Sequence, residues 1–439
     1  MSILFTTVKG PSSPSEDSAH GPIGCPTPYA EPLWYSRNVS PHYTTLHRKL
    51  RAAVRKYVDE EILLYAFDWE SAGKVPDSAR AAPQAWRRHA ELGYLALSTG
   101  LSDVKLPGDI KPEEWDSWHT LIVTDELSRV VRSRAVNFGT EEQKAKFLPG
   151  VANGSIRFCL GITEPDAGSD VANIKTTAVS SGGHYVVNGS KKWITNAIWA
   201  DYVTAAVRTG GVGASGISLL IIPLKADGVS RRTMHNSGVG ASGSTFLTFD
   251  DDVKVPIENL LHKEGRGFEV IMSNFNAERK SIASSAIRLS RVCAEDAWKH
   301  ACTRETFGKK LIENPVIRAK FVKMGRMIEP AQAFLEQLTW LIELGREDGG
   351  ENDMRIGGMT AMLKVVSTRC LEKCVREAQQ IMGGLGYARG GKGGRIEAIS
   401  RDVRVMTVVG GGSEEIMSEL AIKEEVKDLK RYSSTFSKL

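Results

Sequence analysis

The chain of 439 residues has little of what marks several special classes of protein. Its six cysteines form no Cys-x-x-Cys pair and have no histidine nearby at metal-ligand spacing, which argues against a zinc site and a disulfide framework. No run of about 18 apolar residues is present, so we expect no membrane-spanning helix. The net charge is only +5 and is spread along the chain, which argues against nucleic acid as a partner. These absences fit an intracellular protein with reduced thiols.

The composition is that of a globular protein, with 41% hydrophobic and 25% charged residues. Residues 1–40 are rich in proline, serine and glycine and have no signal-peptide or transit-peptide pattern, so we expect a flexible tail there. Residues 433–439 form a second predicted tail that ends in Ser437, Lys438 and Leu439. A free C-terminal Ser-Lys-Leu is recognised by the peroxisomal import receptor, which predicts a peroxisomal location.

The periodicity of apolar residues changes twice along the chain. From 41 to 156, apolar residues recur three and four positions apart, as in amphipathic helices. From 157 to 266, short runs predict strands, and Asn188-Gly189 between two such runs predicts a hairpin turn. From 267 to 432 helical spacing returns, and one long helix is expected to stop at Gly383-Gly384. The sequence therefore predicts helical, β and helical domains in that order, an α+β fold.

One carboxylate lies within an apolar helical stripe of the last region. Positions 275, 278, 282, 286, 289 and 293 follow one another at steps of three or four, and Glu278 is the only acid among them. Burial disfavours the charged form of a carboxyl group and raises its pKa, which suits a general base that works near neutral pH. A structural ion pair at the edge of the stripe is the more common role of such a residue. Spacing alone leaves both interpretations open.

A glycine-rich motif, "VVGGGSEEIM" at 408–417, fits a phosphate-binding loop, a catalytic loop that carries a base, or the start of a helix. This motif and several others, in order, resemble the acyl-CoA dehydrogenase family. The others are "FGTEEQKAKFLPGVANG" (138–154), "GITEPDAGSDVANIKTTA" (161–178), "NGSKKWITN" (188–196), "VKVPIENLLHKEGRGFEVIM" (253–272), "RETFGKKL" (304–311) and "AQQIMGGLGY" (378–387). Several motifs at compatible spacings are far more specific than any one of them. The resemblance implies a helical N-terminal domain, a middle β-barrel or sandwich and a C-terminal four-helix bundle.

The resemblance also implies where the catalytic groups lie. In many members the loop carries the catalytic glutamate at the position of Gly411, which this chain lacks. A branch that includes isovaleryl-CoA and long-chain acyl-CoA dehydrogenases places its glutamate on the helix instead, at the position of Glu278. Glu278 is therefore expected to remove the α-proton of an acyl-CoA thioester, while the β-hydrogen leaves as hydride to flavin N5. The backbone N–H of Gly411 and a flavin ribityl hydroxyl are expected to stabilise the oxyanion.

The remaining matches assign residues to the cofactor and the substrate. The FAD-binding residues implied by the resemblance are Ile162, Thr163, Ser169, Trp193, Thr195, Arg304, Phe307, Gln380, Gly383, Gly384, Ser413 and Glu415. The substrate-binding residues are Ser169, Phe275, Asn276 and Arg279. On composition alone, Trp193 is an ordinary strand aromatic and Gly383-Gly384 a helix cap. No residue is assigned to a metal.

Arg304 and Phe307 match residues that reach the FAD of a neighbouring subunit, so we expect a homodimer or homotetramer. The implied role is fatty-acid or branched-chain catabolism by β-oxidation. Electrons would pass to an electron-transfer flavoprotein, or directly to O2 if the protein is an acyl-CoA oxidase.

Two departures from the family pattern leave a further alternative open. Pro315 stands after "RxxFG" where the family commonly has a glutamine, and it removes a backbone donor. The segment 129–138, which in the family lines the acyl-chain cavity, is shorter here. The alternative to an active enzyme is therefore a flavin-binding oligomer with impaired catalysis.

Overall fold

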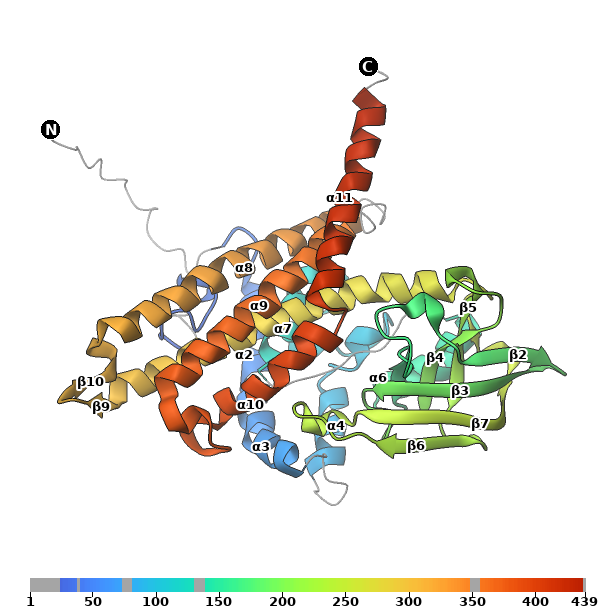
Figure 1. Cartoon of the computed structure of the whole chain (residues 1–439), viewed down its shortest axis with the longest axis horizontal. Helices are drawn as coiled ribbons and strands as arrows, with labels where there is room; N and C mark the ends of the chain where they lie inside the picture. The colour runs from blue at the N-terminus through green and yellow to red at the C-terminus, as the bar shows by residue number, and fades with distance from the viewer. Residues whose placement is uncertain (1–23, 38–39, 73–80, 130–138, 348–355, 437–439) are drawn as a thin grey trace.

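The chain folds into helices, then a β sheet, then helices again, which confirms the predicted α+β architecture (Figure 1). The computed structural model describes residues 24–37, 40–72, 81–129, 139–347 and 356–436. The sheet forms one end of the molecule, and the long C-terminal helices form the other. The predicted tail 433–439 is helical as far as Phe436, and the Ser437-Lys438-Leu439 motif lies outside the described residues.

The first helical region packs its apolar faces against the C-terminal helices. Its helices are α1 (Leu33–Arg37), α2 (Thr45–Tyr57), α3 (Leu63–Ala72), α4 (Ala81–Glu91), α5 (Ser117–Leu127) and α6 (Glu141–Ala152). In α2, the buried residues Leu50, Val54 and Tyr57 follow one another at steps of four and three, which places them on one face. That face joins one hydrophobic cluster with Ile122 of α5 and Leu335 of the C-terminal region.

The segment from Gly24 to Arg37 is folded, so the prediction of a flexible tail over residues 1–40 is wrong for that part; residues 1–23 lie outside the described residues. Trp34 is buried and stacks on Tyr43 with ring centroids 3.7 Å apart. Ala30 is also buried, and its carbonyl accepts a hydrogen bond from Arg288 at 3.2 Å. The proline-rich composition suggested disorder. The segment is ordered instead by partners elsewhere in the sequence, and composition alone does not reveal such contacts.

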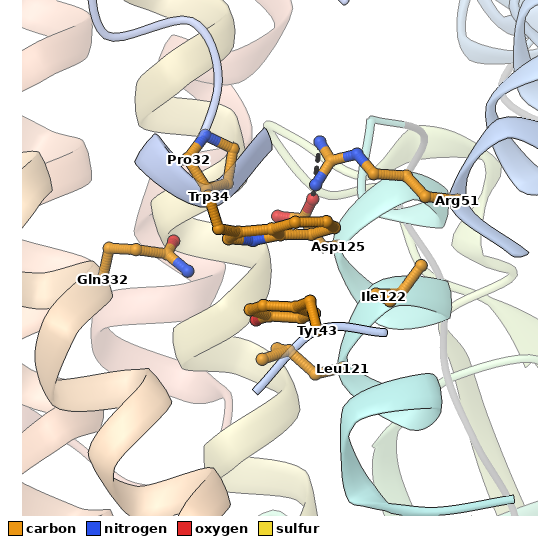
Figure 2. A pocket seen from close by; sticks show the side chains of 8 residues that line it. All are labelled: Pro32, Trp34, Tyr43, Arg51, Leu121, Ile122, Asp125 and Gln332. Carbon is orange, nitrogen blue, oxygen red and sulfur yellow. Dashed lines mark ion pairs between the residues drawn. The ribbon is translucent and has the colours of Figure 1, made fainter. Parts of the chain in front are cut away.

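A buried network of charges fixes this N-terminal segment in place. Glu31 bonds Arg51 at 2.8 Å and Arg288 at 3.2 Å, and Arg288 also bonds Asp125. Burial raises the pKa of Glu31, but the surrounding guanidinium groups outweigh that and hold it well below its usual range. A small cavity beside Arg51 and Asp125 has room for about one water (Figure 2).

The middle region forms one mixed sheet. Its strands are β1 (Phe158–Gly161), β2 (Thr177–Ser181), β3 (His184–Ile194), β4 (Tyr202–Arg208), β5 (Ile217–Pro223), β6 (Val229–Thr233), β7 (Thr245–Pro256) and β8 (Leu260–Leu261). The strand order is β6-β7-β3-β2-β4-β5-β8, with β1 paired to β4 in parallel. Residues of β5 alternate between two hydrophobic clusters, Leu220 on one face and Leu219 on the other. Because both faces of β5 are covered, its sequence is a continuous apolar run.

The hairpin turn predicted at Asn188-Gly189 is wrong. Strand β3 continues through both residues, and the turn lies at Gly182-Gly183, where both residues have positive φ. Gly189 lies in a β-bulge, and a Cβ atom there would come within 2.6 Å of Thr176 Oγ1. Glycine is needed at position 189 for this close approach and not for a turn.

The C-terminal region is dominated by three long helices. Its elements are α7 (Gly267–Thr303), β9 (Glu305–Thr306), β10 (Lys309–Lys310), α8 (Pro315–Glu347), α9 (Gly357–Met382), α10 (Gly394–Arg404) and α11 (Glu414–Phe436). With 37 residues, α7 is about 55 Å long and runs from the sheet to the β9-β10 hairpin (Figure 1). As predicted, α9 ends at Gly383, which has a φ of 59°. Among the described residues, no helix has the length and apolarity to cross a membrane.

Candidate active site

Glu278 lies on α7, in the part of the helix closest to the sheet. Its side chain is partly buried and accepts one hydrogen bond, from Asn274 Nδ2 at 2.9 Å. Asn274 lies four residues earlier on the same helix, so the two side chains share a face. Within the described ranges no cation forms an ion pair with Glu278, since the adjacent Arg279 bonds Asn276 and Gly411 instead. Among the residues that the structure describes, the ion-pair alternative for Glu278 is thus not realised.

The surroundings of Glu278 raise the pKa of its carboxyl group above the ordinary value. Burial raises the pKa of the carboxyl group, and the hydrogen bond from Asn274 and the charge of Arg279 offset this only in part. The predicted apolar stripe continues along α7 beyond Glu278, since Ala286, Leu289 and Cys293 are all buried. A carboxylate in such a place binds a proton more readily than one in water, which is the property a general base needs.

The loop of the glycine-rich motif lies against α7 at Arg279 and Ile282, in the helical turn that follows Glu278. Gly411 has a φ of 69°, a conformation that glycine adopts without strain. A Cβ atom at position 411 would lie 3.2 Å from Ile282 Cδ1 and 3.3 Å from Arg279 Cγ. The loop therefore passes within contact distance of the helical turn that follows Glu278. Of the three interpretations, the start of a helix is confirmed, because α11 begins at Glu414, and the loop ahead of it also contacts the helix that carries Glu278.

The carbonyl and the N–H of Gly411 differ in their hydrogen bonding. The carbonyl of Gly411 accepts a hydrogen bond from Arg279 Nε at 3.3 Å. Among the described residues, the N–H of Gly411 has no acceptor. An N–H group without a protein acceptor, on a loop that contacts the turn after Glu278, is available to bind an oxygen that gains negative charge.

The middle domain contributes a second group of predicted residues. Trp193 lies in an irregularity of β3, has a φ of 64°, and exposes 44% of its surface. An aromatic residue with positive φ is unusual and signals a local constraint. Thr195 and Ser169 are also exposed, whereas Ile162 is buried in a cluster that includes Phe275 of α7. Ile162 and Phe275 thus connect the sheet to the helix that carries Glu278.

A buried ion pair supports this edge of the sheet. Lys191 Nζ donates to Glu164 Oε1 at 2.7 Å and to the carbonyl oxygen of Ile162 at 3.2 Å. The N–H of Lys192 donates to the carbonyl of Thr163 at 2.8 Å. The two bonds to the carbonyls of Ile162 and Thr163 hold residues 162–163 next to the strand that carries Trp193. Lys191 and Glu164 were not predicted, because nothing in their spacing shows that they meet.

The third group of predicted residues lies at the opposite end of the helices. Arg304 ends α7, and Phe307 occupies the two-residue turn between β9 and β10. Phe307 is fully exposed and has a φ of 51°. Gln380 and Gly383-Gly384 are exposed at the end of α9. Arg304 follows Glu278 by 26 residues, about 39 Å of helix, and the β9-β10 hairpin lies at the end of α7 away from the sheet, so one chain does not bring all the predicted cofactor residues together (Figure 1).

The remaining predicted positions surround the start of α11 and the start of α8. Ser413 precedes α11 and accepts a hydrogen bond from the N–H of Met417, whereas Glu415 is exposed. Pro315 is the first residue of α8, where a helix leaves its N–H groups unpaired in any case. Pro315 therefore removes no hydrogen bond from the helix. Residues 130–138 of the shortened segment lie outside the described residues.

A polar cluster of His47, Asp116 and His119 has the composition of a metal site, although none of these residues was predicted as a ligand. Nδ1 of His47 accepts a hydrogen bond from the N–H of Thr44 at 2.9 Å, so the proton of the neutral ring lies on Nε2 and points to Asp116. Asp116 in turn accepts from the N–H of His119 at 2.8 Å and caps α5. These bonds use the lone pairs that a metal needs, so the cluster is explained by helix capping.

Comparisons with known proteins agree along the whole chain. The N-terminal, middle and C-terminal domain models of acyl-CoA dehydrogenases match residues 44–155, 159–252 and 265–425. Acyl-CoA dehydrogenase AFT10-1 of Alternaria alternata is 47% identical over 94% of this chain and 99% of that protein. Acyl-CoA dehydrogenase apdG of Emericella nidulans is 41% identical over 91% and 95%. The crystal structure of a probable acyl-CoA dehydrogenase from Mycobacterium abscessus has a TM-score of 0.75 at 32% identity and covers 87% of this chain and 98% of that one.

Proposed function

Because the chain belongs to the acyl-CoA dehydrogenase family and is an oxidoreductase, we propose that it dehydrogenates the Cα–Cβ bond of an acyl-CoA thioester with Glu278 as the base. The observation that carries this proposal is the pairing of two groups. Glu278 is a carboxylate whose surroundings raise its pKa, and the Gly411 N–H, on the loop that contacts the helical turn after Glu278, lacks an acceptor among the described residues. A base and an oxyanion donor are the two groups that removal of an α-proton requires.

In the proposed reaction, a Glu278 oxygen accepts the proton from Cα of the thioester. The negative charge that develops on the thioester carbonyl oxygen is stabilised by the N–H of Gly411. Asn274 holds the carboxylate in place through its 2.9 Å hydrogen bond. Arg279 keeps the loop against α7 through the carbonyl of Gly411. The hydrogen on Cβ leaves with its electron pair, and FAD, when bound, supplies the acceptor for that hydride.

The middle domain fits the flavin ring of FAD, the cofactor that this family generally binds. Trp193 presents an exposed indole face beside the polar side chain of Thr195, and the strand end at 162–163 lies next to it. A half-exposed aromatic on a rigid strand is a suitable platform for a planar ring. Ile162, Thr163, Trp193 and Thr195 would hold that ring on the side of the site that faces away from Glu278's helix neighbours.

The residues at the far end of α7 support an oligomer. Phe307 is a large apolar side chain that is fully exposed on a tight turn, next to the cation of Arg304. Within a single chain they lie at the end of α7 away from the sheet that contains Trp193, so they would serve the FAD of a second subunit (Figure 1). The proposed assembly is a homodimer or homotetramer in which each cofactor contacts two chains.

The proposed location is the peroxisome, and the motif that supports it is the C-terminal Ser437-Lys438-Leu439. A fluorescent protein fused ahead of the chain should colocalise with a peroxisomal marker. The same fusion without the last three residues should stay diffuse. Equal distribution of both fusions would refute the proposal.

An anaerobic titration of the purified protein with straight and branched acyl-CoAs tests the proposed function. The flavin absorbance should bleach, and Glu278→Gln should lower the rate of bleaching by about 10²–10⁴-fold. Glu269→Gln is the matched control, because Glu269 lies on the same helix in an exposed ion pair with Arg266. Repeating the assay with O2 or an electron-transfer flavoprotein identifies the electron acceptor. A protein that binds FAD but bleaches with no acyl-CoA would support the flavin-binding alternative instead.

A further inference from the structure

Lys364 is a buried cation that the proposed reaction does not use. It lies on α9, and its side chain is fully buried. Its ammonium group donates to the carbonyl oxygens of Gly412 at 2.5 Å and Thr407 at 3.2 Å. No carboxylate within the described part of the chain forms an ion pair with it. Burial of an ammonium group without an acid is unfavourable, so its two carbonyl contacts require an explanation.

The carbonyl of Gly412 belongs to the loop that contains Gly411, and Thr407 lies in the short π-helix Val405–Val409 that leads into this loop. Lys364 bonds the chain before and after Gly411, and Arg279 of α7 bonds the carbonyl of Gly411 itself. Cations from two helices thus hold consecutive carbonyls at 411 and 412. Gly411 and Gly412 have φ values of 69° and 97°, which direct these carbonyls toward the helices.

The anchoring of the carbonyls decides where the free N–H of Gly411 points. The peptide plane after Gly411 is fixed by Arg279, and the next plane is fixed by Lys364. With that side held, the N–H group of Gly411 moves only by rotation about the two backbone bonds of Gly411 itself, N–Cα and Cα–C. We propose that Lys364 is a positioning residue that holds the loop so that the Gly411 N–H stays directed at the reacting carbonyl oxygen. This inference rests on the proposed function.

The charges around Lys364 distinguish this role from a merely structural one. Arg279 faces it from α7, and Glu414 and Glu415 face it from the first turn of α11. Burial, and next the charge of Arg279, lower the pKa of Lys364 from 10.5 to about 8. A lysine pKa that is lower in the folded state means that the charged form opposes folding. Stability therefore increases as the pH rises from about 8 to 10.5, while the loop loses its cation over the same range.

The test replaces Lys364 with methionine, which keeps the chain length and removes the charge. For Lys364→Met we expect kcat to fall at least about tenfold, KM to change less than about threefold, and the melting temperature to stay equal or rise. Amide exchange of residues 408–413 should become faster, and this readout does not depend on catalysis. Lys364→Gln keeps N–H donors without the charge. Its kcat and its amide exchange rates should therefore lie between those of the wild type and those of Lys364→Met. Lys373→Met, at an exposed position of the same helix, is the matched control.

Several outcomes would overturn the inference. One is a kcat of Lys364→Met within twofold of an active wild type. Another is a fall in kcat that accompanies a lower melting temperature and lost flavin, which would indicate a structural role. If Lys364→Met does not fold, the wild type decides, because its kcat must fall as the pH rises through about 8 without a fall in melting temperature. If the wild type bleaches with no acyl-CoA, the proposed function fails, and unchanged amide exchange in the variant would then refute the positioning role separately.

Discussion

Replacing Gly411 with alanine tests whether the loop backbone, and not a loop side chain, serves the reaction. At a φ of 69°, an alanine is strained by about 1–2 kcal/mol relative to glycine. Its Cβ atom would also lie within 3.4 Å of two flexible side chains, those of Ile282 and Arg279. The loop either keeps its shape and retains this strain, or it rotates and releases it.

The hydrogen bonds of the loop decide between these two responses. The peptide plane after Gly411 is bonded to Arg279, and a hydrogen bond from a charged donor contributes about 1.5–3 kcal/mol. Among the described residues, the plane before Gly411 has no such bond at either the carbonyl of Gly410 or the N–H of Gly411. Rotation of that free plane is therefore the cheaper response. It removes the strain and turns the N–H away from the substrate.

For Gly411→Ala we therefore expect a loss of stability below about 1 kcal/mol and a fall in kcat of about 10²–10³-fold, the usual effect of losing one oxyanion donor. The assays are single-turnover flavin bleaching with an acyl-CoA and urea denaturation. The control is Gly182→Ala in the β2-β3 turn, where φ is 58° and the surrounding space is open. The control should lose about 1–2 kcal/mol of stability and keep its activity. A Gly411→Ala variant that behaves like the control would refute the reasoning.

Three further predictions follow from the same geometry. Only deprotonated Glu278 accepts a proton and burial raises its pKa, so kcat/KM should increase with pH around a midpoint above 4.5; a midpoint below 4.5 in the pH profile would contradict this. Arg304→Ala should weaken FAD retention in gel filtration without unfolding the chain, and unchanged retention would argue against its role at a neighbouring subunit. Arg288→Met removes one of the two buried guanidinium partners that Glu31 and Asp125 share with Arg51 and should lower the free energy of unfolding by about 3–5 kcal/mol in urea; a loss below about 1 kcal/mol would contradict the importance of the network.

The candidate site was predictable from the sequence where its residues share one helix. Glu278 stands out because a helix places residues three and four apart on one face, and the structure places it on that face. Asn274, four residues earlier, was predictable by the same rule, although the spacing gives no sign of the hydrogen bond. Lys364 was not predictable, because its partners at 407 and 412 lie on another element and are backbone atoms.

The errors in the fold have a common physical origin. The hairpin signal at Asn188-Gly189 is local, but the need for glycine at 189 comes from Thr176 on the neighbouring strand. The segment 24–37 has the composition of a tail, but its order comes from Arg288, more than 250 residues away. In both cases a distant contact outweighs the local preference. Local rules therefore fail where the partner is far away in the sequence.

The sequence by itself determined the order of helical, β and helical regions, the end of α9 at Gly383 and the position of one acid in an apolar stripe, because these depend on periodicity and backbone preference within one element. Only the tertiary structure decided that the Gly411 loop contacts the helix of Glu278 and that cations from α7 and α9 hold its carbonyls. It also decided that Arg304 and Phe307 lie at the end of α7 away from the sheet that contains Trp193. These relations depend on how elements pack, and packing brings together atoms that the sequence keeps far apart.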